Sequence, residues 1–217
     1  ATGSGKTTLA GLIPRCYDAT QGTVLVDGVD VRDYTFDALY DRLGYVTQKA
    51  VLFSGTVQDN IFFGQSEAAD TGETLQQALQ LSQAAEFVDR YPEKAAHPIA
   101  QLGRNVSGGQ KQRLSIARAL ARKPEILIFD DSFSALDYKT DAVLREGLAK
   151  QLPGTTKIIV AQRISTIRNA DQILVLDRGE IAGLGTHDAL MASCTVYREI
   201  AMSQLSEEEL KKGGASK

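Results

Sequence analysis

Tryptophan is absent from this sequence of 217 residues, and cysteine, methionine and histidine occur only twice each. Cys16 and Cys194 lie far apart and show neither the close spacing of a metal site nor a redox C-x-x-C pair. Both are therefore interpreted as reduced thiols of a cytosolic domain. His97 and His187 are interpreted as structural or solvated side chains rather than catalytic ones.

Long apolar runs are also missing. The longest, at residues 126–129 and 158–161, fit buried strands and fall far short of the roughly 20 residues that span a bilayer. The net charge of -3 provides no overall basic field of the kind that draws proteins to nucleic acid, so no nucleic-acid partner is expected. With 43% hydrophobic residues, the chain can bury one core with a lobe attached.

Helical and extended patterns alternate along the chain. In the first half they predict a helix over 5–13, two short strands over 23–26 and 29–31 around the turn Asp27-Gly28, and a helical lobe between Thr56 and Tyr91. In the second half they predict helices over 110–121 and 142–152 and strands over 126–129, 157–161 and 173–176. This order predicts an α/β fold with a mostly parallel sheet covered on both faces. The charged tail over 206–217 is expected to end a helix and fray.

The first eight residues, ATGSGKTT, fit the phosphate-loop motif G-x-x-x-x-G-K-[ST], except that its first glycine would lie one residue before Ala1. No initiator methionine or secretory signal precedes them, so we expect a chain that is truncated within the motif. Backbone N–H groups in such a turn form an anion nest at a helix N-terminus. Lys6 would hold the β- and γ-phosphates of ATP, and the Thr7 hydroxyl would bind Mg²⁺. The predicted phosphate-binding residues are Thr2, Gly3, Ser4, Gly5, Lys6, Thr7 and Thr8.

A chance glycine-rich loop before a helix would match these eight residues equally well, so a second motif is needed. The apolar run 126–129 is followed directly by Asp130 and Asp131. A phosphate-loop NTPase needs one acid there for the Mg²⁺ shell, here Asp130, and a neighbour that orients the attacking water, here Asp131. By itself, such a pair could merely cap a loop.

Residues 105–113, NVSGGQKQR, resemble the signature sequence of ABC ATPases, and the similarity extends to about residue 205. Gln48 resembles the glutamine of the family's Q-loop, residues 134–137 its D-loop, and residues 185–188 its closing turn. The resemblance implies a RecA-like phosphate-loop NTPase core at 1–55 and 110–205, an inserted α-helical subdomain at about 56–109, and a small antiparallel β portion. Together these form one nucleotide-binding domain over 1–205.

Two such domains are implied to sandwich ATP, with the phosphate loop of one facing the signature of the other. The Ser107 hydroxyl and the amides of Gly108 and Gly109 would grip the γ-phosphate from across the interface. Gln110 and Asp137 are implied as further nucleotide-binding residues. Gln48 is implied to contact both nucleotide and Mg²⁺, beside Thr7 and Asp130, and to take part in catalysis.

The segment 48–61, QKAVLFSGTVQDNI, resembles exporters rather than importers of the family, at the place where the ATPase domain docks on transmembrane domains. The implied location is the cytoplasmic face of the cell membrane, with transmembrane domains earlier in the same full-length chain. Chromosome-maintenance ATPases carry a very long coiled-coil insertion that this chain lacks, and ribosome-associated factors carry two such domains. A regulatory ATP-binding module stays open, and the transported substrate is not encoded here.

Two positions depart from the family. Active members usually place Glu where this chain has Asp131, whose carboxylate sits one methylene closer to the backbone. They place His where this chain has Gln162, and an amide cannot carry a proton at neutral pH. We therefore expect this site to bind ATP and hydrolyse it slowly. The intact signature favours a heterodimer in which Ser107 completes a competent site on a different chain, and a homodimer with reduced activity is the alternative.

Overall fold

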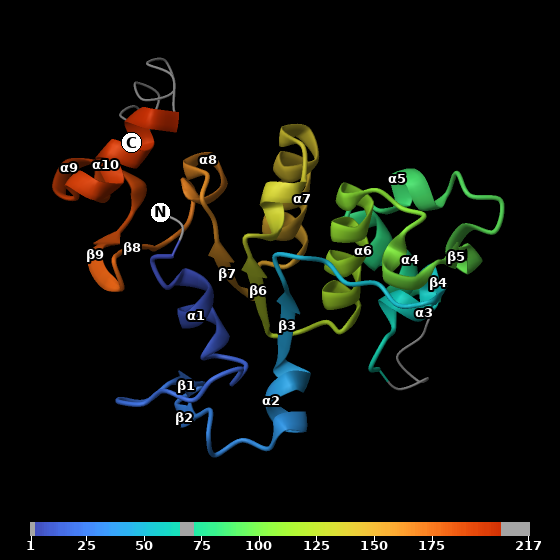
Figure 1. Cartoon of the computed structure of the whole chain (residues 1–217), viewed down its shortest axis with the longest axis horizontal. Coiled ribbons are helices and arrows are strands. Elements are labelled where there is room, and N and C mark those ends of the chain that lie inside the picture. Colours follow the sequence, from blue (N-terminus) through green and yellow to red (C-terminus); the bar gives the residue numbers. More distant parts are fainter. Residues whose placement is uncertain (1–2, 66–71, 205–217) are drawn as a thin grey trace.

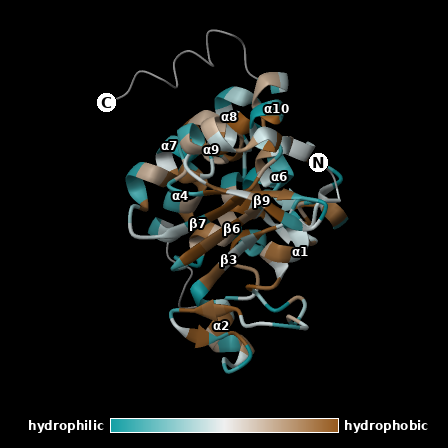
Figure 2. Ribbon diagram, turned by 90° about the vertical axis from the view of Figure 1, so that its left-hand side faces the viewer, coloured by the Kyte–Doolittle hydropathy of each residue, from teal (hydrophilic) through white to brown (hydrophobic). Residues whose placement is uncertain are grey.

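A three-stranded parallel sheet lies at the centre of the computed structural model, which describes residues 3–65 and 72–204 (Figure 1). Its strands are β3 (Leu43–Val46), β6 (Ile126–Asp130) and β7 (Thr156–Val160), in the order β3-β6-β7. Leu127, Ile128 and Phe129 of the middle strand are fully buried. Figure 2 shows these strands as a hydrophobic layer enclosed by helices. A strand buried on both faces needs a continuous apolar run, which is why the run 126–129 predicted β6 correctly.

The helices begin where side chains cap them. α6 (Gly108–Ala121) starts two residues before its predicted position because Ser107 Oγ accepts a hydrogen bond from Gln110 N and Gln110 Oε1 accepts one from Ser107 N. α7 (Tyr138–Gln151) starts four residues early because Asp137 caps it. The other helices are α1 (Lys6–Gly11), α2 (Phe36–Arg42), α3 (Val57–Ile61), α4 (Gly72–Leu81), α5 (Ala85–Val88), α8 (Ile164–Ile167), α9 (His187–Ser193) and α10 (Thr195–Gln204).

Three antiparallel pairs surround the parallel sheet. They are β1 (Leu25–Val26) with β2 (Val29–Asp30), β4 (Gly55–Thr56) with β5 (Pro98–Ile99), and β8 (Ile173–Asp177) with β9 (Glu180–Gly185). The first pair confirms the predicted hairpin, since Asp27 and Gly28 both have positive φ. The strand predicted at 173–176 is confirmed as β8, which belongs to an antiparallel pair and not to the parallel sheet. It pairs with β9 through a tight turn at Arg178-Gly179, both also at positive φ.

One hydrophobic cluster joins the sheet to the helical lobe. It contains Val46 of β3 and Phe129 of β6 together with residues of α3, α4, α5 and α6. The lobe gathers on the side of α6 that faces away from β7 (Figure 1). The predicted division into a core at 1–55 and 110–205 and a subdomain at 56–109 stays a prediction, because the apolar packing is continuous between them. Among the described helices, none is long and apolar enough to cross a membrane.

A second cluster holds the C-terminal part. Tyr197 of α10 is buried, and its hydroxyl lies 2.8 Å from Nδ1 of His187, the first residue of α9. His187 was predicted to be either structural or solvated, and this buried contact agrees with the structural alternative. Burial raises the pKa of Tyr197 to about 12. Burial also lowers the pKa of His187 from 6.5, and the charge of Arg168 acts in the same direction. The fold therefore favours the neutral imidazole.

This lowered pKa predicts a pH dependence of stability. Below about pH 6.5 the unfolded chain binds a proton at His187 that the folded chain resists, so the free energy of unfolding should fall as the pH drops. A His187→Gln variant keeps an acceptor for the Tyr197 hydroxyl but cannot titrate, so its stability should change less between pH 7 and pH 5. Urea unfolding of both proteins across this range measures the difference. Identical pH profiles would contradict the prediction.

Candidate nucleotide-binding site

Four predicted site residues lie at the carboxyl ends of the three parallel strands. Gln48 comes shortly after β3, Asp130 is the last residue of β6 and Asp131 follows it, and Gln162 comes shortly after β7. Because parallel strands direct their carboxyl ends to one edge of the sheet, side chains distant in sequence meet there. A cavity of about 240 Å³ opens at this edge and is lined by Gly3, Ser4, Gly5, Lys6, Thr7, Thr8, Gln48, Asp131, Val160 and Gln162. The structure thus brings most of the predicted site together.

The glycine-rich loop forms one wall of this cavity. Gly3 and Gly5 have φ of +83° and +91°, which glycine adopts without strain, and a Cβ at either would meet no atom within 4 Å. The loop backbone therefore presents an open, concave surface. Ser4 is buried, and its hydroxyl accepts a hydrogen bond of 2.9 Å from Lys6 Nζ. α1 begins at Lys6, so its N-terminus faces the same space. Thr2 lies outside the described residues.

The carboxylate of Asp130 lies beside this loop. The Thr7 hydroxyl donates to Asp130 Oδ1 at 2.8 Å, and the Tyr45 hydroxyl donates to Asp130 Oδ2 at 3.2 Å. Burial, together with the charge of Asp130, raises the pKa of Tyr45. A hydroxyl and a carboxylate beside a phosphate loop are the oxygen donors that Mg²⁺ takes from proteins. The residues present therefore fit Mg²⁺ with a nucleotide. Gln48 was also predicted as a metal ligand, but its side chain contacts Asp131 and not Thr7 or Asp130.

Tyr45 escaped sequence analysis because β3 itself was not predicted. The strand LGYV contains Gly44, which weakens a strand pattern. A Cβ at Gly44 would lie 2.8 Å from Leu127 Cδ2 and 2.9 Å from Pro124 Cγ, so the close packing of β3 needs this glycine. In the sequence, Tyr45 could have been identified as a site residue from its position three residues before Gln48, at the end of an extended segment.

Asp131 accepts two hydrogen bonds on a single oxygen. Gln48 Nε2 lies 3.0 Å and Gln162 Nε2 2.7 Å from Asp131 Oδ2. The residue is 7% exposed and has a left-handed backbone, φ 48° and ψ 24°, which ends β6 and turns the chain. The two amides therefore clamp the carboxylate. Buried Gln112 of α6 supports this arrangement from behind, donating to Thr47 O at 3.2 Å just before Gln48.

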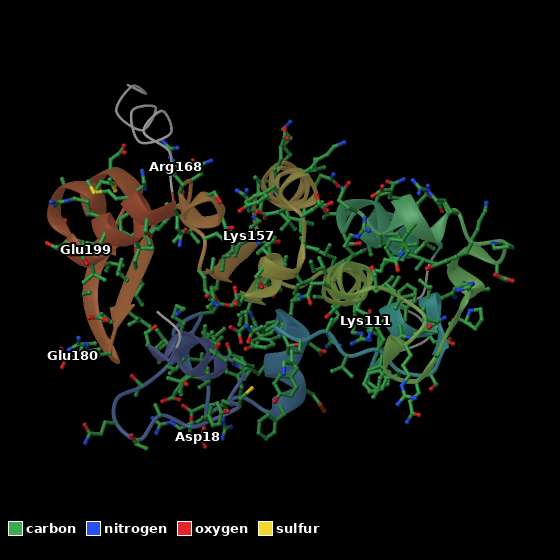
Figure 3. The ribbon with its side chains drawn as sticks, turned by 45° about the horizontal axis from the view of Figure 1, so that its top comes forward. Asp18, Lys111, Lys157, Arg168, Glu180 and Glu199 are labelled. Carbon is green, nitrogen blue, oxygen red and sulfur yellow. The ribbon has the colours of Figure 1, made fainter. Side chains whose placement is uncertain are left out.

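The signature residues do not line this cavity. Ser107 and Gln110 hydrogen bond to each other as the cap of α6, and Gly108 is exposed beside them. A Cβ on Gly109 would lie 3.6 Å from Ala135 O, so the start of α6 adjoins the 3-10 turn after β6. Figure 3 shows Lys111, in the first turn of α6, on the opposite side of the sheet from Arg168, which follows α8.

Asp137 also lies apart from the cavity. Its oxygens accept from Thr140 N at 2.9 Å and from Thr140 Oγ1 at 2.7 Å, and these bonds lower the pKa of Asp137. In this chain Asp137 therefore serves as the N-cap of α7, outside the cavity. Its predicted contact with nucleotide stays a prediction.

Comparison with known protein families and structures agrees with this geometry. The family described as ABC transporter matches residues 1–134. An uncharacterized ABC transporter ATP-binding protein of Mycobacterium bovis is 48% identical over 205 residues, which cover 94% of this chain and 35% of that protein. An ATP-dependent lipid A-core flippase of Syntrophus aciditrophicus is 41% identical over 209 residues, which cover 96% of this chain and 34% of that protein.

A solved structure gives the same relationship. A bacterial Atm1-family ABC exporter with ATP bound superposes with a TM-score of 0.90 at 37% identity, over 95% of this chain and 36% of that chain. The chain thus spans about one third of the length of the relatives that it matches. At this identity the similarity shows common ancestry as well as a common fold.

The contact between Thr7 and Asp130 predicts a Mg²⁺-dependent effect. Thr7→Val keeps the shape of the side chain and removes the hydroxyl, so the affinity for ATP in the presence of Mg²⁺ should fall by about 10- to 100-fold. Affinity in the presence of EDTA should change much less. Titration calorimetry measures both, and Thr7→Ser, which retains the hydroxyl, is the control. An equal loss with and without Mg²⁺ would show that Thr7 acts on the loop and not on the metal.

Proposed function

The chain belongs to the ABC transporter family, as its ATP-binding domain, and we propose that this domain binds and hydrolyses ATP to drive an exporter. One observation carries the proposal: the phosphate loop, the Thr7–Asp130 pair and Asp131 meet at a single edge of the sheet. Lys6 would neutralise the phosphates, and the loop amides would orient them. Mg²⁺, when bound, would offset the charge that develops on the phosphoryl group.

Transport would follow from pairing of two such domains. The exposed Ser107 and Gly108 lie away from the chain's own cavity and are free to meet a nucleotide held by a second domain. ATP that binds the closed pair better than the open pair would shift the equilibrium towards closure by differential affinity alone. Attached transmembrane domains would respond to that closure. We place the domain at the cytoplasmic face of a membrane, with transmembrane domains in the same full-length protein.

The chain's own site would hydrolyse ATP slowly. Asp131 would orient the attacking water, and the amides of Gln48 and Gln162 hold its Oδ2 in place. Asp reaches less far than Glu, and Gln162 supplies an amide where a titrating group would assist proton movement. We therefore favour a heterodimer whose partner carries the competent catalytic residues. A symmetric homodimer with reduced activity is the alternative that the next experiment separates.

Restoring the usual residues should activate the site. In the intact protein, Asp131→Glu combined with Gln162→His should raise the single-turnover rate of ATP hydrolysis by about 100-fold, because it restores a longer carboxylate and a titrating side chain. Rapid-quench measurement with the protein in excess over ATP reports this site alone when the phosphate-loop lysine of a partner of different sequence is substituted, because the partner's own site is then silent. A wild-type rate as high as that of the double variant would refute the slow-site proposal and favour the homodimer.

The role of Ser107 can be tested separately from its role as a helix cap. Ser107→Ala removes both the helix cap and the hydroxyl offered to the phosphate. It should lower the free energy of unfolding by about 1 kcal/mol and abolish most ATP hydrolysis at the partner's site. Ser107→Asn keeps a good N-cap but changes the group offered to the phosphate. It should therefore retain stability and lose hydrolysis. Calorimetric melting and steady-state ATPase assays measure the two effects, and full activity of Ser107→Asn would contradict a phosphate contact.

A further inference from the structure

α8, the short helix that follows the loop of Gln162, has no side-chain cap of its own. Its N-cap residue is Arg163, which makes no capping hydrogen bond. The first amide of the helix is satisfied from elsewhere: Ile164 N donates to Gln204 Oε1 at 2.9 Å. The same side chain donates from Nε2 to the backbone carbonyl of Gln162 at 2.8 Å. One amide group thus satisfies a donor and an acceptor two residues apart.

Gln204 is the exposed last residue of α10, and the packing of this helix holds its backbone. Tyr197, Ala201 and Gln204 are spaced by four and three residues and therefore share one face of the helix. Tyr197 and Ala201 are almost fully buried, in the cluster that also contains Ile164. α10 lies beside α8 in Figures 1 and 2, and Figure 3 places Glu199 of α10 and Arg168 on the same side of the molecule. α10, which carries Gln204, is thus packed against the same hydrophobic cluster as α8.

Gln162 links Gln204 to the candidate nucleotide site. Gln162, whose carbonyl accepts from Gln204, donates from its own side chain to Asp131 Oδ2 at 2.7 Å. Two backbone groups on either side of Arg163 are fixed by Gln204, so the direction in which the Gln162 side chain leaves the loop is fixed as well. Arg163 Nη2 also ties this loop to Ser134 O at 3.3 Å, but the contact that holds the backbone carbonyl of Gln162 itself comes from Gln204. Without it, Gln162 could adopt several orientations, most of which miss Asp131.

We propose that Gln204 is a positioning residue, which fixes the loop of Gln162 and thereby the amide that contacts Asp131. It does not touch nucleotide or the reacting atoms. α10, at the far end of the chain from the phosphate loop, is in this way coupled to the hydrolysis site. The structural part of the proposal stands without nucleotide, whereas the effect on hydrolysis rests on the function proposed above.

The structural part is tested by hydrogen–deuterium exchange in the intact protein without nucleotide. Gln204→Leu removes the amide group and with it both hydrogen bonds, so the amides over 162–167 should exchange about tenfold faster. Gln204→Glu keeps only an acceptor for Ile164 N and should give an intermediate rate. Met202→Leu, at a position of α10 that is 58% exposed, is the matched control and should leave this segment unchanged. Unchanged exchange in Gln204→Leu would overturn the proposal.

The effect on the site is tested by a double-mutant cycle with Gln162→Ala. Gln204→Leu should lower the single-turnover rate of ATP hydrolysis by about three- to tenfold, the range expected from the loss of one or two hydrogen bonds, with unchanged affinity for ATP. In the Gln162→Ala background it should have no further effect. If the two substitutions lower the rate additively, or if Gln204→Leu weakens ATP binding, Gln204 has a merely structural role and the proposal that it positions Gln162 is overturned. If the protein hydrolyses no ATP at all, the proposed function fails, and the exchange experiment alone decides whether Gln204 fixes the loop.

Discussion

Parallel pairing of β6 with β3 and β7 is the constraint on which the site depends. The pairing aligns Val46 with Phe129 and Asp130 with Val160, so the residues that follow the three strands arrive at one edge. The strands stay aligned because β6 is buried from Leu127 to Asp130 and its two neighbours share its hydrogen bonds. Every polar contact of the site, from Thr7 to Gln162, is built on that edge.

The end of β6 then separates two carboxylates by environment. Asp130 remains in the strand, and its carboxylate accepts hydrogen bonds from the hydroxyls of Thr7 and Tyr45. Asp131 adopts a left-handed backbone conformation, and its carboxylate accepts hydrogen bonds from two side-chain amides. Hydroxyl donors leave Asp130 suited to a metal shell, since they can themselves turn to a cation. Amide donors hold Asp131 without providing any group that titrates near neutral pH. Adjacent residues of the same type therefore have different chemical capacities.

Much of this arrangement was predictable from local patterns. The apolar run before Asp130-Asp131 predicted β6, the turn Asp27-Gly28 predicted the first hairpin, and the residues of the phosphate loop were identified by their spacing. The failures share a cause. β3 was missed because Gly44 is placed by the packing of Leu127 and Pro124, which are distant in sequence, and Tyr45 was missed with it.

The sequence by itself determined the family, the glycine-rich loop that matches the phosphate-loop motif, the acidic pair and the unusual residues at positions 131 and 162, because each depends on residue type at a fixed spacing. Only the tertiary structure decided which side chains those residues meet. Gln48 and Gln162 share one oxygen of Asp131, Tyr45 joins Asp130, and Gln204 caps the loop of Gln162. These contacts join segments separated by 31 to 85 residues, and a hydrogen bond depends on distance and direction in space, which no local pattern encodes.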